Sequence, residues 1–123
     1  KKYTRKKMIC TNPDLIVHRG LESEYCAGTL ALAFKELGGK VVYFGKPYPE
    51  IYNFCVKSRE NILAIGDNLQ TDIRGANNMK FDSLFIINGI HRKEFLNLPI
   101  ENYDKILEKY NTKTNYYQKR LNW

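Results

Sequence analysis

Lys46, Asp67 and Asp72 have the side-chain types and the spacing for phosphate chemistry assisted by a metal ion. The short apolar run at residues 61–65 stops at Gly66 and Asp67, and Asp72 follows five residues later. Magnesium prefers oxygen ligands and is usually held by one or two carboxylates together with a substrate phosphate. A lysine can neutralise a phosphoryl group as a point charge. The three residues therefore predict a site for Mg²⁺ and a phosphate, where catalysis depends mostly on positioning and charge stabilisation.

The position of each residue predicts its role. Asp67 follows a predicted buried strand, and we expect it to contact the metal directly, because ligands of open α/β sheets bind beyond the carboxyl ends of the strands. Asp72 lies at a predicted helix start and is expected to be an auxiliary ligand, although an aspartate there is more often a helix cap. Lys46 follows an earlier strand. A receiver-type signalling domain uses similar residues, but there the acidic pair precedes the lysine.

The elements that would position these residues alternate along the chain between helices and strands. Strands that are apolar without alternation predict burial on both faces of a parallel sheet. Short connections predict right-handed crossovers between the parallel strands. We expect helices at residues 25–37, 49–58, 72–79 and 103–110, strands at 7–11, 41–44, 62–65 and 84–87, and an extended tail at 116–123.

Local patterns set the expected details of these elements. Apolar residues at three- and four-residue spacing predict the buried face of a helix. A polar cluster from His18 to Gly20 is expected to break the brief apolar run at residues 15–17, and Thr71 is expected to be the N-cap of the third helix. The glycines at 38 and 39 predict a left-handed helix end. The predicted buried faces consist of Leu30, Ala33, Phe34 and Leu37 in the first helix and Ile51, Phe54 and Cys55 in the second.

Composition indicates one globular domain in a chain of 123 residues with 43% hydrophobic and 27% charged residues. No apolar stretch approaches the roughly 20 residues of a membrane span, and no signal-peptide pattern opens the chain, so we expect a cytoplasmic protein without a membrane partner. Cys10, Cys26 and Cys55 are an odd number without CxxC spacing. They predict buried, reduced thiols rather than a disulfide framework or a zinc site.

The net charge of +7 raises the question of a nucleic-acid partner. Five of the first seven residues are basic. One aromatic residue, Tyr3, and one arginine, Arg5, stand among these lysines, which is no extended aromatic or arginine platform and favours a solvated terminus instead. We therefore do not expect nucleic acid as the main partner.

Four motifs occur in a fixed order along the chain. They are Thr-Asn-Pro-Asp at residues 11–14, Cys-Ala-Gly at 26–28, Gly-Lys-Pro at 45–47 and Gly-Asp-x-x-x-Thr-Asp at 66–72. Together they resemble the haloacid-dehalogenase-like (HAD) phosphohydrolases, specifically the subgroup with a large α/β cap (class IIA), which includes nitrophenyl-phosphatase-like enzymes. The resemblance extends from about Met8 to Arg92.

The resemblance implies hydrolysis of a small phosphorylated metabolite through an aspartyl-phosphate, with Mg²⁺ as the cofactor. Lys46 would steady the nucleophile and the phosphate. Asp67 would bind the metal, and Asp72 and Asn68 would support it. These roles are carried over onto residues of this sequence that match the family's motifs.

The resemblance also implies how the chain is divided. Residues 1–20 would be the remnant of the end of the cap domain, and residues 21–123 would be the C-terminal half of the core. Asn12 and Asp14 would lie near the junction of cap and core, close to the substrate entrance.

The family's nucleophile has no counterpart in this sequence. It is the first aspartate of an Asp-x-Asp-Gly motif at the end of the first core strand, and no Asp-x-Asp occurs in the chain. The Ser/Thr phosphate motif and nearly all of the cap are also missing. We therefore expect an α/β fold, a partial HAD-type Rossmann-like parallel sheet flanked by helices that lacks the first core strand and most of the cap. We expect no activity of the chain alone, since an aspartyl-phosphate needs a positioned nucleophile.

Loss of a central strand has a further expected consequence. The strand at residues 41–44 or 62–65 would present an unpaired apolar edge, which favours pairing with another chain. The expected partner is a complementing N-terminal half or a second copy, and without one the chain would be marginally stable. Two other functions stay open: a non-catalytic binding or assembly module, and a basic nucleic-acid-binding protein.

Overall fold

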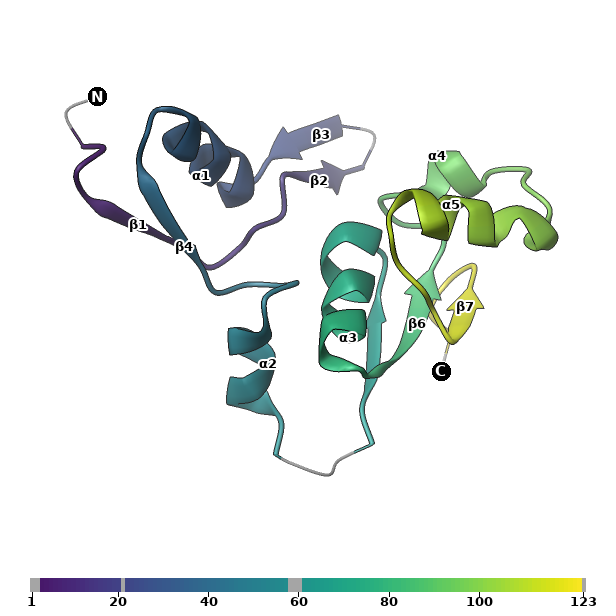
Figure 1. Ribbon diagram of the computed structural model, residues 1–123. Coiled ribbons are helices and arrows are strands. Elements are labelled where there is room, and N and C mark those ends of the chain that lie inside the picture. The colour runs from purple at the N-terminus through teal and green to yellow at the C-terminus, as the bar shows by residue number, and fades with distance from the viewer. Residues whose placement is uncertain (1–2, 21, 58–60, 123) are drawn as a thin grey trace. The chain divides into compact units, whose positions relative to one another are not determined.

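The computed structural model describes residues 3–20, 22–57 and 61–122 (Figure 1). The chain divides into two compact units, Lys1–Cys55 and Val56–Trp123, which we call the first and the second unit. Both units combine parallel strands with helices. The predicted α/β class is therefore confirmed. No helix in the described ranges is both long and apolar enough to cross a membrane.

The first unit is built on two parallel strands and one long helix. Strand β1 pairs with β4, and Met8 lies opposite Val41. Strands β2 and β3 form a separate antiparallel hairpin. The elements are β1 (Lys7–Cys10), β2 (Ile16–Arg19), β3 (Glu22–Tyr25), α1 (Ala27–Glu36), β4 (Lys40–Tyr43) and α2 (Pro49–Cys55).

The hairpin corrects two expectations. The predicted break at His18 is wrong, because β2 continues to Arg19 and the chain turns at Gly20, which has a φ of 63°. Tyr25 does not open the first helix but ends β3. Polar cross-strand contacts replace an apolar pattern here, and Ser23 Oγ lies 3.0 Å from His18 Nδ1. The apolar run at residues 15–17 indicated only the start of β2, and the rest of the hairpin has no apolar alternation that would predict strands.

The buried face of α1 is not the predicted one. Leu30 is 68% exposed and Leu37 is 58% exposed, whereas Gly28 and Ala31 are buried. Small residues on this face let the helix backbone approach the turn at residues 11–14 closely, and the Gly28 amide donates to the Asp14 carbonyl over 3.1 Å. The predicted left-handed end of the helix is confirmed, since Gly38 has a φ of 87°.

Burial on both faces of the strands was also wrongly predicted. Val41 and Val42 in β4 are only half-buried, and Leu63 of β5 in the second unit is 46% exposed. Among the described residues, β4 has β1 as its one strand partner and β5 has β6. The predicted apolar face of α2 is exposed as well, with Phe54 at 91%, and the expected helix end at Ser58 lies outside the described residues.

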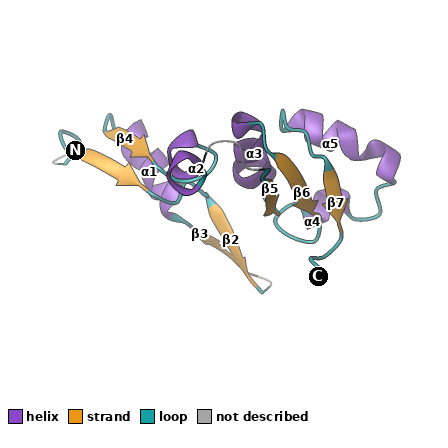
Figure 2. Ribbon diagram, turned by 90° about the horizontal axis from the view of Figure 1, so that it is seen from below, coloured by secondary structure: helices purple, strands orange, loops and turns teal. Residues whose placement is uncertain are grey.

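The second unit is a three-stranded parallel sheet in the order β5-β6-β7 (Figure 2). Helical segments connect the parallel strands, as predicted. The right-handedness of these crossovers stays a prediction. The predicted third strand, last helix and extended tail are confirmed, although Trp123 lies outside the described residues. The elements are β5 (Leu63–Gly66), η1 (Leu69–Ile73), α3 (Arg74–Met79), β6 (Asp82–Ile86), α4 (Arg92–Phe95), η2 (Ile100–Asn102), α5 (Tyr103–Lys109) and β7 (Tyr116–Gln118).

One face of this sheet carries a packed core. Phe85 of β6 is buried, and its ring lies 5.2 Å from Phe95 of α4. Phe95 in turn meets Tyr103 of α5 edge-on at 5.0 Å. The other face is less covered. Leu84 of β6 is half-buried there, and its register partner Ile65 of β5 is exposed. The core cluster consists of Leu69, Ile73, Phe85, Ile87, Phe95, Tyr103 and Leu107.

The three cysteines are free thiols. Cys10 is buried in β1, Cys26 is half-buried and Cys55 is exposed at the end of α2. The expectation of unpaired cysteines is therefore confirmed, whereas burial holds for Cys10 alone. Cys55 is exposed because α2 buries none of its residues.

Candidate active site

Asp67 follows β5 directly and is half-buried. Its Oδ2 accepts a hydrogen bond from the Ile90 amide over 3.0 Å. Gly89 approaches so closely that a Cβ there would overlap the Asp67 carboxylate. Within the described ranges, Oδ1 accepts no hydrogen bond. One oxygen thus fixes the side chain while the other stays open at the carboxyl end of β5, where ligands of such sheets bind.

Asp72 is 9% exposed and braces the loop that carries Asp67. Its Oδ2 accepts hydrogen bonds from the amides of Asp67 and Asn68, each over 3.1 Å. The α-carbon of Gly66 lies so close that a Cβ there would overlap the Asp72 side chain. Asp72 thus holds the loop that precedes the helix, and it is not the N-cap of that helix. Its role as an auxiliary metal ligand stays a prediction.

The helix after this loop begins earlier than expected. The N-cap is Asn68 and not Thr71, because Asn68 Oδ1 accepts a hydrogen bond from the Gln70 amide over 2.9 Å. The first turn, η1, is a π-turn in which the Ile73 amide donates to the Asn68 carbonyl over 3.2 Å. Thr71 is buried instead, and its hydroxyl has no hydrogen-bond partner among the described residues.

His91 is a residue of this site that the sequence did not reveal. It is buried, and its Nε2 accepts a hydrogen bond from the Leu69 amide over 3.2 Å. Because Nε2 accepts, the ring proton is assigned to Nδ1, which lies 2.8 Å from Glu94 Oε1 and donates to it. His91 therefore ties the backbone of the Asp67 loop to α4. The spacing of His91 and Glu94, three residues apart at a helix start, was the one available hint.

Glu94 accepts hydrogen bonds from the last residue of α5 and from Tyr110, which follows it. Tyr110 Oη donates to Oε1 over 2.7 Å, and Lys109 Nζ donates to Oε2 over 3.1 Å. Burial raises the pKa of Glu94, but the hydrogen bonds from His91, Tyr110 and Lys109 outweigh it and lower the pKa below its ordinary value of 4.5. Burial and the Glu94 carboxylate raise the pKa of Tyr110 to about 12.

Three of the four sequence motifs meet in the first unit. Gly45 is approached by the ring of Pro13 and the carbonyl of Thr11, so closely that a Cβ would overlap them. Gly28 is approached in the same way by the carbonyls of Pro13 and Asp14. These glycines are required because the motif backbones touch.

The predicted residues of the first unit lie around this contact. Asn12 Oδ1 accepts a hydrogen bond from the Asp14 amide over 3.2 Å, which closes the turn. Lys46 is exposed in the turn after β4, its bond to Pro47 is cis, and the Tyr48 amide donates to the Gly45 carbonyl over 3.0 Å. Lys46 is thus presented by a turn that packs against the segment containing Asn12 and Asp14.

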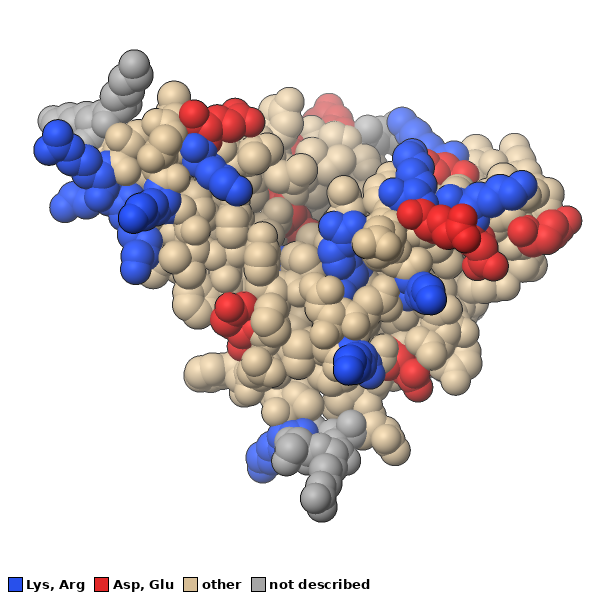
Figure 3. All heavy atoms as spheres, viewed as in Figure 1, with Lys and Arg blue, Asp and Glu red and all other residues tan. Residues whose placement is uncertain are grey.

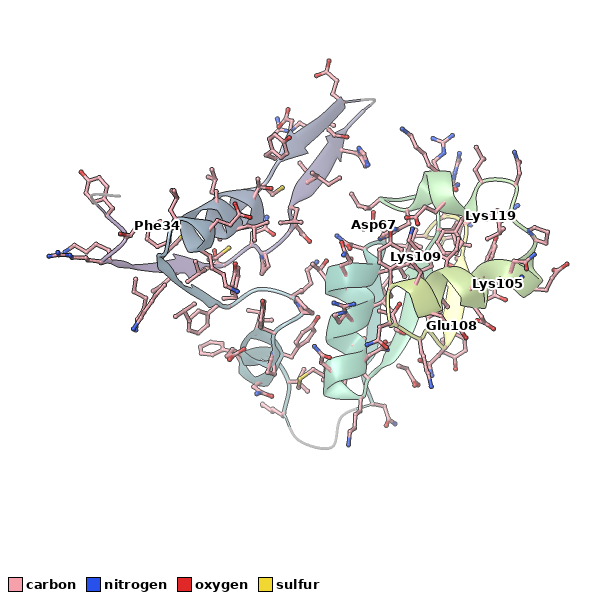
Figure 4. All side chains as sticks on the ribbon, turned by 45° about the horizontal axis from the view of Figure 1, so that its top comes forward. Phe34, Asp67, Lys105, Glu108, Lys109 and Lys119 are labelled. Atoms are coloured by element: carbon pink, nitrogen blue, oxygen red, sulfur yellow. The ribbon has the colours of Figure 1, made fainter. Side chains whose placement is uncertain are left out.

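The structure therefore assembles the predicted site as two groups. Asn12, Asp14 and Lys46 belong to the first unit, and Asp67, Asn68 and Asp72 belong to the second. Asp67 is labelled in Figure 4. Among the described residues, no three His, Cys, Asp or Glu side chains gather into a metal site. Magnesium does not require such a cluster, because it keeps several waters and takes one or two protein carboxylates. The single open carboxylate oxygen of Asp67 fits that requirement in part.

The fold and the site define a class of hydrolase in which a parallel sheet carries an acidic loop at its carboxyl end. A family model described as HAD-hydrolase-like matches residues 43–112, which include Lys46, Asp67, Asp72 and His91. The match covers more than half of the chain, which therefore belongs to the HAD-like hydrolase family. No curated protein sequence matches it.

Solved structures agree with this assignment. A haloacid dehalogenase-like hydrolase from Brucella suis is 29% identical with a TM-score of 0.71, and the match covers 94% of this chain and 44% of that one. A p-nitrophenyl phosphatase from Archaeoglobus fulgidus shares the fold at 20% identity and a TM-score of 0.66, with 91% and 42% covered. A glycerol phosphate phosphatase from Mycobacterium tuberculosis, solved with calcium, is 27% identical with a TM-score of 0.57, with 67% and 25% covered. The chain spans less than half the length of each.

Proposed function

We propose that the chain is the C-terminal half of a magnesium-dependent HAD-type phosphohydrolase. It would hydrolyse phosphate monoesters through an aspartyl-phosphate once another segment supplies the nucleophilic aspartate, and it would be inactive alone. The observation behind the proposal is the Asp67 carboxylate, fixed through one oxygen and open at the other at the end of β5. The phosphatases among the similar structures support the proposed activity. The lack of an Asp-x-Asp motif in the sequence supports the proposed inactivity of the chain alone.

Each residue of the second unit has a proposed task. Asp67 would hold Mg²⁺, which supplies charge neutralisation on the phosphate when bound. Asp72 would keep the amides of Asp67 and Asn68 oriented through its two hydrogen bonds. Asn68 would support the ligand set from the N-cap position. His91 would hold the loop from behind through the Leu69 amide.

The first unit would handle the phosphate and the substrate. Lys46 would neutralise the phosphoryl oxygens and keep the nucleophile ionised. Asn12 and Asp14 would lie near the substrate entrance. In this proposal residues 1–20 derive from the end of a cap domain and residues 21–123 from the core. The substrate would be a small phosphorylated metabolite of the cytoplasm.

The strand edges indicate how the site would be completed. Among the described strands, β4 pairs with β1 alone and β5 with β6 alone, so each has an edge open to a further strand. Unpaired strand edges favour pairing with another chain. A nucleophile-bearing N-terminal half is the proposed partner, and a second copy is the alternative.

A complementation assay tests the proposal. The chain is assayed with Mg²⁺ and p-nitrophenyl phosphate alone and after mixing with a segment that carries Asp-x-Asp-Gly. We expect turnover in the mixture only, lost in Asp67→Ala and retained in Asp104→Ala, which removes an exposed carboxylate on α5. Robust turnover by the chain alone that Asp67→Ala abolishes would overturn the claim of incompleteness. An inactive mixture in which the two segments form a stable complex would overturn the proposed activity.

A binding or assembly module is the second candidate function, and the exposed apolar side chains of Leu63 and Ile65 on the open sheet face favour it. Such a module would keep a stable complex with its partner when both Lys46 and Asp67 are changed to alanine. Loss of the complex in these variants would exclude it. The third candidate, a nucleic-acid-binding protein, would need the exposed basic residues Arg5, Lys6 and Lys7. Figure 3 shows in blue the Lys and Arg side chains on one face of the molecule. Binding that does not weaken with salt would eliminate it.

A further inference from the structure

The second unit contains a cavity of about 680 Å³ that none of the predicted site residues lines. Ile86 and Ile87 line it where β6 ends, and Lys119 and Arg120 line it just after β7. Parallel strands of open α/β sheets present ligand sites beyond their carboxyl ends. The volume lies within the range of pockets for small molecules, about 300–1,000 Å³.

The backbone at the cavity is fixed by hydrogen bonds that continue the sheet. The Ile87 amide donates to the Gln118 carbonyl over 2.9 Å, and the Asn88 amide donates to the Lys119 carbonyl over 3.1 Å. Two chain segments that follow neighbouring strands are therefore held in register beyond the strand ends. A ligand here would meet a preformed site rather than a loose tail.

Among the described residues, three cations line the cavity and no acidic side chain does. They are Arg92, Lys119 and Arg120. In the described part of the chain, none of their side chains forms a salt bridge or a hydrogen bond. Lys109 provides the contrast, since its Nζ is paired with Glu94 Oε2 at 3.1 Å. Unpaired cations around one hollow attract an anion, and arginine in particular matches the oxygens of phosphate and carboxylate groups.

The cavity also has an apolar wall. Phe95 and Tyr103 line it and are held by the core, with their rings edge-on at 5.0 Å. Leu96 and Leu98 extend the same wall. A bare inorganic anion would use only the basic part of this lining. An anion with an apolar body would use both parts.

We propose that this cavity binds a small organic anion, a phosphate or carboxylate group carried on an apolar or aromatic body, at a site separate from Asp67. The two sites share one segment, because Asn88 and Arg92 line the cavity while Ile90 and His91 contact the Asp67 loop. Figure 4 shows Lys119 apart from Asp67 in that view. The proposal does not depend on the phosphohydrolase activity, and its test uses no turnover.

The test is a titration of the chain without Mg²⁺, followed by amide chemical shifts and calorimetry. The probes are inorganic phosphate, phenyl phosphate and phthalate, of which the last two separate the phosphate from the carboxylate source. We expect at least one aromatic anion to bind more tightly than inorganic phosphate and to shift the amides of Asn88, Phe95 and Lys119. The double variant Arg92→Gln, Arg120→Gln should bind at least about tenfold more weakly, since each cation contributes a charge-assisted hydrogen bond.

Two controls separate this site from other causes. Lys93→Gln removes the same charge beside Arg92 but does not line the cavity, and it should change affinity little. Lys46→Gln disables the predicted phosphoryl site and should have no effect. Equal weakening by Lys93→Gln would show a general charge effect and overturn the proposal. Loss of binding in Lys46→Gln, no preference for either aromatic anion over inorganic phosphate, or no binding at millimolar concentration would overturn it as well.

Discussion

The two units of the chain differ in how much they bury. In the described part of the second unit, seven buried apolar side chains, Phe85 among them, form one core cluster. In the described part of the first unit, Cys10 and Ala31 are the only buried hydrophobic residues. The acidic loop is therefore built on a packed core, whereas the Lys46 turn stands on a two-stranded sheet with little burial. Two halves of one predicted site thus have very different support.

The apolar side chains of the first unit show what its structure leaves unsatisfied. Ile9, Leu30, Leu37 and Phe54 are all largely exposed. Burying such a side chain fully would contribute about 1.5–3 kcal/mol, so several potential contributions to stability are unused. We expect the second unit to dominate the stability of the chain, and the first unit to gain most from a partner.

The largest expected effect is the loss of the core around Phe85. Phe85→Ala should lower the free energy of unfolding by about 3–5 kcal/mol, because it removes a buried ring and leaves a cavity. Phe54→Ala in the first unit should change it by less than about 0.5 kcal/mol, since that ring is already in water. Urea unfolding monitored by circular dichroism measures both. Equal losses would contradict the contrast between the units.

The next effect concerns the brace beneath Asp67. Asp72→Ala should cost about 1–3 kcal/mol, because it leaves the amides of Asp67 and Asn68 without their acceptor. The rate of hydrogen exchange at these two amides should rise by the factor that corresponds to the same free energy. Asp72→Asn keeps an acceptor oxygen in place and should lose less. If both variants protect the two amides as well as the parent chain does, Asp72 does not brace the loop.

A smaller effect is the pH dependence carried by the Glu94 network. The folded pKa of Glu94 is lowered, so its stabilisation is present above the ordinary value of 4.5 and is lost as the pH falls through the lower folded value. The pKa of Tyr110 is raised to about 12, so its stabilisation is present below 10 and is lost as the pH rises through about 12. Unfolding midpoints across pH should lose the acid component in Glu94→Gln and the alkaline component in Tyr110→Phe. Unchanged profiles in both variants would contradict the network.

Thiol labelling compares the local stability of the two units without a mutation, and it is the smallest of these effects. Cys55 is exposed and should react at once, whereas Cys10 is buried and should react only when the first unit opens. As urea is raised, labelling of Cys10 should begin before the aromatic signal of the second-unit core is lost. Simultaneous transitions would show that the chain unfolds as one cooperative body.

Much of the second unit was predictable from local patterns. The strand before Asp67, the strand at Phe85 and the helix at Tyr103 follow from apolar runs and helical spacing, which report burial within a short window. The polar hairpin at His18 was missed because exposed strands carry no apolar alternation. The burial of β4 and β5 was overestimated because it depends on neighbouring strands, which a single segment does not reveal.

The candidate site shows the same division. Asp67 and Asp72 were identified from their place after a strand. In the structure, Asp72 accepts hydrogen bonds from the backbone amides of Asp67 and Asn68. His91 was missed because its contact with the Leu69 amide spans 22 positions along the chain. Thr71 was mistaken for the cap because a π-turn starts the helix at Leu69, and the spacing of side chains alone does not distinguish a π-turn from an α-turn.

The role of Asp67 as the metal ligand is tested most directly by a Mg²⁺ titration of the chain followed by amide chemical shifts, with Asp67→Asn as the matched variant. We expect saturable shifts at the amides of Asp67, Asn68 and Ile90 in the parent chain, because the open oxygen of Asp67 binds the ion. These shifts should vanish in Asp67→Asn, which keeps the shape of the side chain but removes its charge. Shifts that are absent, or that persist in Asp67→Asn, would contradict the assignment of Asp67 as the metal ligand.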